Sequence, residues 1–196
     1  MRSRLLGGLG VAVVLATAMA GCTKDQPGGV APPPQPTTSF AFPVPPVTHR
    51  WQPDGLVCPT LSGSAAQGGG LTGPGKRVRG TDSRNGSLLY CQWGPDDETA
   101  GSAELQVSTS KRQESADAAW KVVAAPGLFD NPLPGVGEQA FVGPDTGNQF
   151  HVIVRSGNAI LDITLKAVTS DAAALKALHD AAPGIATEML GVLVPA

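Results

Sequence analysis

The sequence has few of the side chains that most often carry catalytic or metal chemistry. Its 196 residues include three histidines, three cysteines and one tyrosine. His49, His151 and His179 lie far apart, so they lack the short spacings typical of zinc ligands. There is no G-x-S-x-G motif, and neither His151 nor His179 has an evident acidic partner. We therefore expect no metal, no cofactor and no enzymatic activity.

An excess of positive charge is also absent. The chain has 14 basic and 16 acidic residues, a formal net charge of −2, which becomes −4 if a signal peptide carrying Arg2 and Arg4 is removed. A mildly acidic chain does not attract polyanions through its net charge. This argues against nucleic acid as a partner, and against membrane binding by attraction to anionic lipids.

The N-terminus has the features of an export signal. Arg2 and Arg4 precede an uncharged run over residues 5–18, which is shorter than the about 20 apolar residues that span a bilayer. The run leads into Met-Ala-Gly-Cys, and small residues before a cysteine are what a lipoprotein signal peptidase requires. We predict a signal peptide over residues 1–21 and an acylated Cys22, which anchors the chain to the extracytoplasmic face of the cell membrane. In the alternative, an ordinary secretory signal, Cys22 has no role.

Residues 22–53 are too rich in proline to form a core. The prolines include Pro27, Pro32, Pro33, Pro34, Pro36, Pro43, Pro45 and Pro46. Proline has no amide donor and favours polyproline II, which extends about 3.1 Å per residue. We predict a lipidated, disordered tether that reaches on the order of 90 Å when fully extended. The alternatives are a leader with no required length and a proline-rich ligand for a partner.

Two cysteines remain if Cys22 is acylated. Cys58 and Cys91 form an even pair in an oxidising compartment, where a disulfide is the expected state. A metal site would need further ligands, and redox-active cysteines usually lie close in sequence, as in C-x-x-C. We predict a structural disulfide between Cys58 and Cys91.

The rest of the chain, residues 54–196, has the length of one extracytoplasmic domain. Alternating apolar and polar residues between turn signals predict five strands, and apolar residues spaced three and four apart predict two helices. The strands are expected at 88–93, 103–110, 138–142, 148–155 and 159–168, and the helices at 112–123 and from a cap at Ser170 or Asp171 onward. Pro183 is expected to kink or split the second helix, and the glycine-rich stretch 62–86 to be loop. The fold class is α+β, with two helices on a mostly antiparallel sheet of about five strands.

Two motifs near the predicted loop bear on binding. Residues 70–76 have the G-x-x-x-x-G-K spacing of a phosphate-binding loop, but Arg77 stands where serine or threonine would bind magnesium. We therefore interpret the motif as a flexible glycine loop. Lys76, Arg77 and Arg79 form a basic cluster that either contacts an anionic envelope polymer or a partner, or belongs to an ordinary solvated loop. The acidic run 96–98 supplies too few oxygens for calcium.

Two tryptophans in the predicted helices and strands are candidate contact residues, and one carboxylate is a candidate for hydrolase chemistry. Aromatic residues make up only 5% of the chain, so Trp93 and Trp120 either line a ligand groove or fill a core built from Val, Leu, Ile and Ala. Asp162 lies inside an apolar strand, where a buried acid needs a partner. It either faces solvent or pairs with an arginine on the neighbouring strand, such as Arg155.

Five features spread over most of the mature chain form a recognisable combination. They are Cys22, the proline-rich stalk, Val57-Cys58-Pro59, Cys91-Gln92-Trp93 and the run Gly-Val-Gly-Glu-Gln-Ala over 135–140. The combination resembles an actinobacterial cell-envelope lipoprotein family defined by a domain of unknown function. The resemblance implies an envelope location, supports the disulfide between Cys58 and Cys91, and agrees with a PsbP-like fold. It implies no active site.

These features favour display at the cell envelope over catalysis. We expect a non-enzymatic, membrane-anchored lipoprotein whose domain is a binding or interaction module for an unknown envelope protein, polymer or small ligand. The alternative is an extracytoplasmic carrier or sensor of a small apolar ligand, held between the sheet and the helices. An envelope hydrolase is the third hypothesis.

Overall fold

The computed structural model describes residues 44, 46–95, 101–125, 127–129 and 131–196, all within the unit formed by residues 39–196. The predicted signal peptide, Cys22, most of the predicted tether and the acidic run 96–98 lie outside the described residues. None of the described helices is long and apolar enough to cross a membrane.

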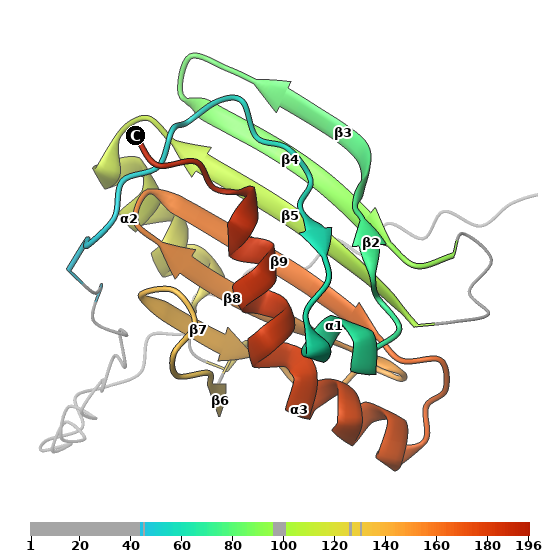
Figure 1. The fold of residues 1–196 in the computed structure, drawn as a ribbon. Coiled ribbons are helices and arrows are strands. Elements are labelled where there is room, and N and C mark those ends of the chain that lie inside the picture. The colour runs from blue at the N-terminus through green and yellow to red at the C-terminus, as the bar shows by residue number, and fades with distance from the viewer. Residues whose placement is uncertain (1–43, 45, 96–100, 126, 130) are drawn as a thin grey trace, which may run out of the picture. The chain divides into compact units, whose positions relative to one another are not determined.

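A seven-stranded antiparallel sheet forms the centre of the fold (Figure 1). The strand order is β3-β4-β5-β9-β8-β7-β6. The strands are β3 (Lys76–Asp82), β4 (Gly86–Trp93), β5 (Ser102–Ser110), β6 (Asn131–Pro132), β7 (Gln139–Val142), β8 (Gln149–Ser156) and β9 (Ala159–Lys166). The α+β class with an antiparallel sheet is confirmed, and the five predicted strands correspond to β4, β5, β7, β8 and β9.

The turn between β8 and β9 fixes the register of the centre of the sheet. Ser156 pairs with Ala159, which leaves Gly157 and Asn158 as a two-residue turn. Gly157 has a φ of 55°, the positive value that such a hairpin turn requires. From this turn the two strands run in register to the pair Gln149 and Lys166. As a result, every second residue of both strands faces the same side of the sheet.

α3 (Ala172–Met189) covers one face of the sheet and buries the main core (Figure 1). Its apolar stripe includes Leu178, Ala182, Ile185 and Met189, which pack with Leu105, Val152, Leu161 and Ile163 of the strands. Asp171 is the N-cap, as predicted, and its carboxylate accepts hydrogen bonds from the amides of Ala173 and Ala174. Pro183 lies inside the helix without splitting it, because Ala182, Ile185 and Ala186 around it are packed in the core.

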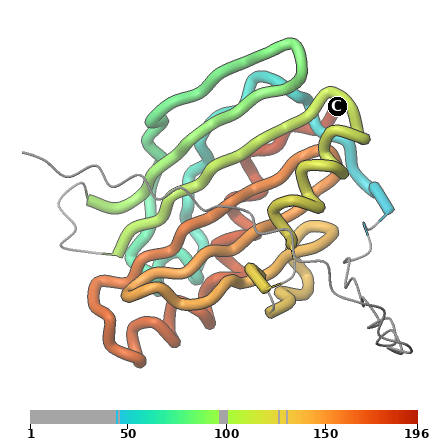
Figure 2. The backbone as a smooth tube through the Cα atoms, turned by 180° about the vertical axis from the view of Figure 1, so that it is seen from behind, coloured from blue at the N-terminus to red at the C-terminus, as the bar shows by residue number. Residues whose placement is uncertain are grey.

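α2 (Gln113–Val123) covers part of the opposite face (Figure 2). Trp120 is buried there with Phe141, Ile153 and Ile160. Arg155 of β8 is fully buried beneath the helix and forms an ion pair with Asp117. This helix therefore closes a second, smaller core at the β7-β8-β9 side of the sheet.

Residues 58–82 contain more structure than the sequence predicts. β1 (Thr60–Leu61) pairs with β2 (Gly73–Pro74), and a disulfide between Cys58 and Cys91 joins this segment to β4, as predicted. The predicted loop over 62–86 is wrong, because it contains α1 (Ser64–Gly68), β2 and β3. β3 is an edge strand that buries no residue, so its sequence lacks the alternation of apolar and polar residues that predicts a strand. Its pairing with β4 is also irregular between Arg77 and Arg79. The glycine motif over 70–76 leads into this strand, whereas a phosphate-binding loop leads into a helix.

The segment before residue 54 is bound to the domain. Trp51 forms a bridge with Pro195, and its indole Nε1 donates to Ser156 Oγ at 3.0 Å. Glu138 accepts hydrogen bonds from the backbone amides of Thr48 and His49, at 3.0 and 3.1 Å. The predicted boundary at residue 54 therefore falls inside the packed region. We call residues 48–53 the N-terminal strap.

Candidate functional site

Figure 2 shows that α2 covers only part of its face of the sheet. On the rest of this face, the burial pattern and strand pairing place a strip of polar side chains. Its members are half-buried or exposed side chains that point to the α2 side of the sheet, opposite to the main core. They are Arg79, Tyr90, Gln92, Ser102, Glu104, Gln106, Gln149, His151, Asp162, Thr164 and Lys166. Five adjacent strands, β3, β4, β5, β9 and β8, contribute to this strip.

The strand register places these residues in rows. Gln92 pairs with Glu104, Glu104 with Thr164, and Thr164 with His151. Directly paired residues in antiparallel strands point to the same face, so these four side chains are neighbours. A second row runs through Tyr90, Gln106 and Asp162.

His151 and Asp162 form a diagonal pair within the strip. The Nδ1 atom of His151 lies 3.1 Å from Oδ1 of Asp162 and 3.3 Å from Oγ1 of Thr164. The hydrogen bond to Asp162 raises the pKa of His151 above its ordinary value of 6.5, although burial acts in the opposite direction. His151 therefore has an acidic partner that is not evident from the sequence. Asp162 does not pair with Arg155, which binds Asp117 instead.

Two shallow hollows lie in the strip and share Glu104. One, of about 280 Å³, is lined by Val78, Arg79, Tyr90, Cys91, Gln92 and Glu104. The other, of about 270 Å³, is lined by Ser102, Glu104, Gln149, His151, Thr164 and Lys166. The carboxylate of Glu104 therefore stands between them, and a long ligand could contact both.

The basic cluster of β3 is dispersed by the strand. The Arg79 guanidinium lies over the ring of Tyr90, 3.6 Å from its centroid, and so belongs to the strip. Arg77 folds back along its own strand, so that its guanidinium lies against Gly80. Lys76 pairs in register with Gln92. The cluster is exposed, as either predicted interpretation requires, and Arg79 is the member that lies over the strip.

Both candidate tryptophans are core residues. Trp93 is 2% exposed and lies beside Cys58, near the disulfide. Trp120 is 1% exposed, and its Nε1 donates to Oε1 of Gln139 at 2.9 Å. Neither indole reaches solvent, which agrees with the packing interpretation and leaves no ligand groove at these side chains.

His179 also has an acidic partner that the sequence does not reveal. Its Nε2 lies 2.6 Å from Oδ1 of Asp145, and its ring stacks on Phe150 with centroids 3.8 Å apart. Phe150 belongs to the main core, on the opposite face from the strip. This pair therefore ties α3 to the loop before β8 and is not part of the polar strip.

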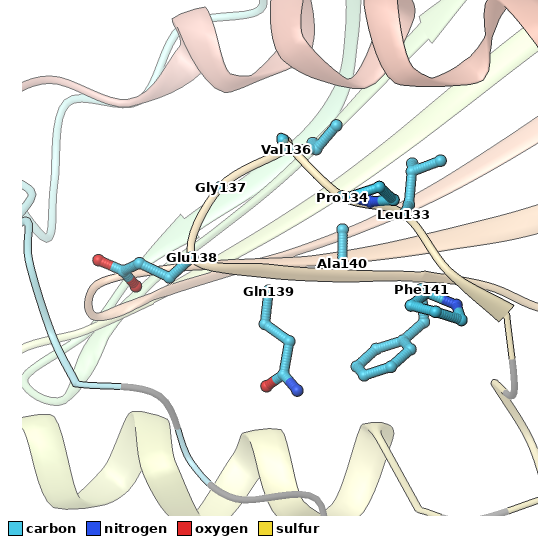
Figure 3. Close-up of a pocket in the computed structure, with 10 residues that line it drawn as sticks. Leu133, Pro134, Val136, Gly137, Glu138, Gln139, Ala140 and Phe141 are labelled. Atoms are coloured by element: carbon cyan, nitrogen blue, oxygen red, sulfur yellow. The ribbon is translucent and has the colours of Figure 1, made fainter.

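A second candidate site is an apolar pocket at the β7 edge of the sheet. It has a volume of about 590 Å³ and is lined entirely by consecutive residues, 132–141. Figure 3 shows Leu133, Pro134 and Val136 on the side of β7 that faces α3, and Gln139 and Phe141 on the side that faces α2. The pocket is large enough for a small ligand. Its lining includes Val136 and Ala140, which are buried in the main core.

Within the described residues, no group of three or more His, Cys, Asp or Glu side chains is arranged to hold a metal ion. Comparisons with known proteins give no further assignment: no family model, no curated protein and no solved structure matches the chain.

Proposed function

We propose that the chain is a lipid-anchored envelope protein whose domain binds a partner through the polar strip, without catalysis. The observation that carries this proposal is the contrast between the two sides of the sheet. One side is buried under α3, while the other presents Gln92, Glu104, Gln106 and His151 in register. A lipid on Cys22 and the proline-rich tether would hold this surface outside the membrane.

The geometry of the strip supports binding more than hydrolysis. On the face of a sheet the backbone amides are engaged between strands, so they do not converge on a ligand as an oxyanion hole does. The contacts of His151 within the strip, Asp162 and Thr164, both lie at Nδ1. This leaves the histidine oriented, but without a nucleophile held against its Nε2 among the described residues.

The second candidate function is the carriage of a small apolar ligand. The observation that favours it is the apolar pocket over 132–141, whose volume of about 590 Å³ falls in the range of ligand sites. Native mass spectrometry of the Cys22→Ala chain tests it. A discrete added mass that disappears in a Leu133→Asp variant supports this function, and a bare mass from freshly isolated protein argues against it.

Binding through the strip is tested by co-sedimentation of the unlipidated Cys22→Ala chain with isolated cell envelopes. Replacing Glu104 and Gln106 together by alanine removes two central side chains of the strip without touching the core. We expect the affinity for the envelopes to fall at least about ten-fold, which corresponds to a loss of about 1.4 kcal/mol of binding free energy. The matched control replaces Lys176 and Asp180 on the exposed side of α3, where they form a solvent-exposed ion pair. Equal sedimentation of both variants would refute the proposal.

The family resemblance, the PsbP-like fold and the extracytoplasmic location remain part of this proposal. The family resemblance and the location are supported by the residues of the signal peptide and stalk, and by the disulfide between Cys58 and Cys91, which is typical of an oxidising compartment. The PsbP-like fold is supported only by the antiparallel sheet with helices packed on it.

A further inference from the structure

We infer that the partner of the polar strip is an uncharged, hydroxyl-rich polymer, that is, a neutral glycan strand. This inference rests on the proposed function, because it names the class of ligand for the same surface. It draws on the chemistry, the charge and the shape of the strip.

The chemistry of the strip does not suit a protein partner. Protein interfaces have an apolar core enriched in aromatic side chains and methionine. At the centre of the strip stand Gln92, Glu104, Gln106 and Thr164, which present amide, carboxylate and hydroxyl groups. The aromatic ring in the strip, Tyr90, has one face covered by Arg79. Sugar hydroxyls both donate and accept hydrogen bonds, so they match this set of side chains.

The charge of the strip does not suit a polyanion or a polycation. Arg79 and Lys166 carry positive charge, and Glu104 and Asp162 carry negative charge, while His151 is held beside Asp162. The opposite charges are interspersed, since Glu104 lines one hollow together with Arg79 and the other hollow together with Lys166. A phosphate-rich polymer would meet carboxylates along its path, and affinity for such a polymer depends on cations that neutralise it. An uncharged ligand is repelled neither by the carboxylates of Glu104 and Asp162 nor by the cations of Arg79 and Lys166.

The shape of the strip suits an extended chain. Five adjacent strands, spaced about 4.8 Å apart, give a surface roughly 19 Å across. Its two hollows are small and lie side by side, joined at Glu104. A compact ligand would fill one hollow, whereas a strand of several sugar units contacts both.

The experiment measures binding of neutral oligosaccharides to the full chain in detergent micelles by isothermal titration calorimetry. The probes are hexamers of N-acetylglucosamine, glucose and mannose, with polyphosphate and polylysine as charged comparators. We expect at least one neutral hexamer to bind, with an affinity that changes less than about two-fold between 50 mM and 500 mM salt. The variant in which Glu104 and Gln106 are alanine should bind at least about ten-fold more weakly, and the variant of Lys176 and Asp180 should bind normally.

Amide chemical-shift mapping on the unsubstituted chain gives a second readout that does not depend on a variant. The expected shifts lie in β4, β5 and β9, and shifts confined to residues 132–141 would overturn the inference. Failure of all three hexamers to bind, or binding of a charged comparator alone with steep salt dependence, would also overturn it. If no hexamer binds but the Glu104 and Gln106 variant still sediments less with envelopes than the unsubstituted chain, the proposed binding function is retained and its ligand belongs to another class. If sedimentation is unaffected, the proposed function fails as well.

Discussion

At the scale of single residues, Arg155 shows how a charge is accommodated in this core. Its side chain is fully buried under α2, and its Nη2 donates to Asp117, whose side chain is one-third exposed. Among the described residues, its Nε and Nη1 groups have no hydrogen-bond partner. A buried charge whose partner is removed is strongly destabilising, because its desolvation is no longer compensated. Asp117 is therefore the residue on which the burial of Arg155 depends.

We expect Asp117→Asn to lower the free energy of unfolding by about 3 kcal/mol, since the guanidinium then remains buried without a carboxylate. Urea unfolding followed by circular dichroism measures the effect. Glu114→Gln, one turn earlier on an exposed position of α2, is the matched control and should change stability little. If both variants unfold at the same urea concentration, the ion pair contributes no more than surface charge does.

The pair of His151 and Asp162 makes a pH-dependent prediction. Because the pKa of His151 is raised in the folded chain, the stabilisation from this pair is fully present below pH 6.5 and is lost as the pH rises through the raised value. Asp162→Asn should bring the pKa of His151 back toward its ordinary value, as measured by NMR titration of the imidazole carbon-bound protons. Glu104→Gln should produce a smaller decrease, since Glu104 acts on His151 through charge alone. An unchanged titration in the Asp162 variant would show that the pair does not form in solution.

At the scale of elements, one carboxylate makes most of the contacts of the first two residues of the N-terminal strap. Glu138 accepts hydrogen bonds from the amides of Gly157, Thr48 and His49 and from the Thr48 hydroxyl. Burial alone would raise the pKa of Glu138, but these hydrogen bonds outweigh burial and lower it below 4.5. The strap should therefore be held firmly above pH 4.5 and released as the pH falls through the lowered value.

Glu138→Gln should weaken the strap, because an amide accepts fewer hydrogen bonds and carries no charge. We expect faster hydrogen exchange at the amides of residues 48–52 at neutral pH, with little change in α3. Exchange measured by mass spectrometry reports both segments in one experiment. Unchanged protection of the strap would mean that Trp51 and its contacts hold it without Glu138.

The disulfide links two elements that are distant in sequence. Cys58 precedes β1 and Cys91 lies in β4, 33 residues later. Replacing both cysteines by serine should destabilise the fold by up to about 3.7 kcal/mol, because the unfolded chain regains the entropy of the open loop. The midpoint of thermal unfolding measures this loss, with Cys22→Ala as the control. An equal midpoint in all three proteins would contradict a stabilising role.

Sequence patterns predict elements with a buried face and miss those without one. β4 and β5 alternate apolar and polar residues, so both were predictable, whereas β3 carries Lys76, Arg77 and Arg79 and buries no face. The part of the strip on β8 and β9 was predictable from the sequence, since the turn at Gly157 and Asn158 sets the register of these two strands. Its extension over β4 and β5 was not, because the pairing of β5 with β9 joins strands that are far apart in sequence.

At the scale of the whole molecule, we propose a lipid anchor at Cys22 joined to a domain whose sheet face is only partly covered by α2. The anchor is tested by Cys22→Ala, which should leave the protein unlipidated and move it from the membrane fraction to the medium. Immunoblotting of the two fractions measures this change, and Cys58→Ser is a control that should stay in the membrane fraction. Retention of the Cys22 variant in the membrane would show that another element anchors the chain.

Photo-crosslinking in intact cells shows whether the domain binds its partner through the polar strip. A photoreactive amino acid replaces Gln106 in the strip or, in a separate strain, Lys176 on the exposed side of α3. The account predicts a crosslinked adduct of shifted mobility from position 106 and none from position 176. No adduct from position 106, or adducts of equal yield from both positions, would contradict it.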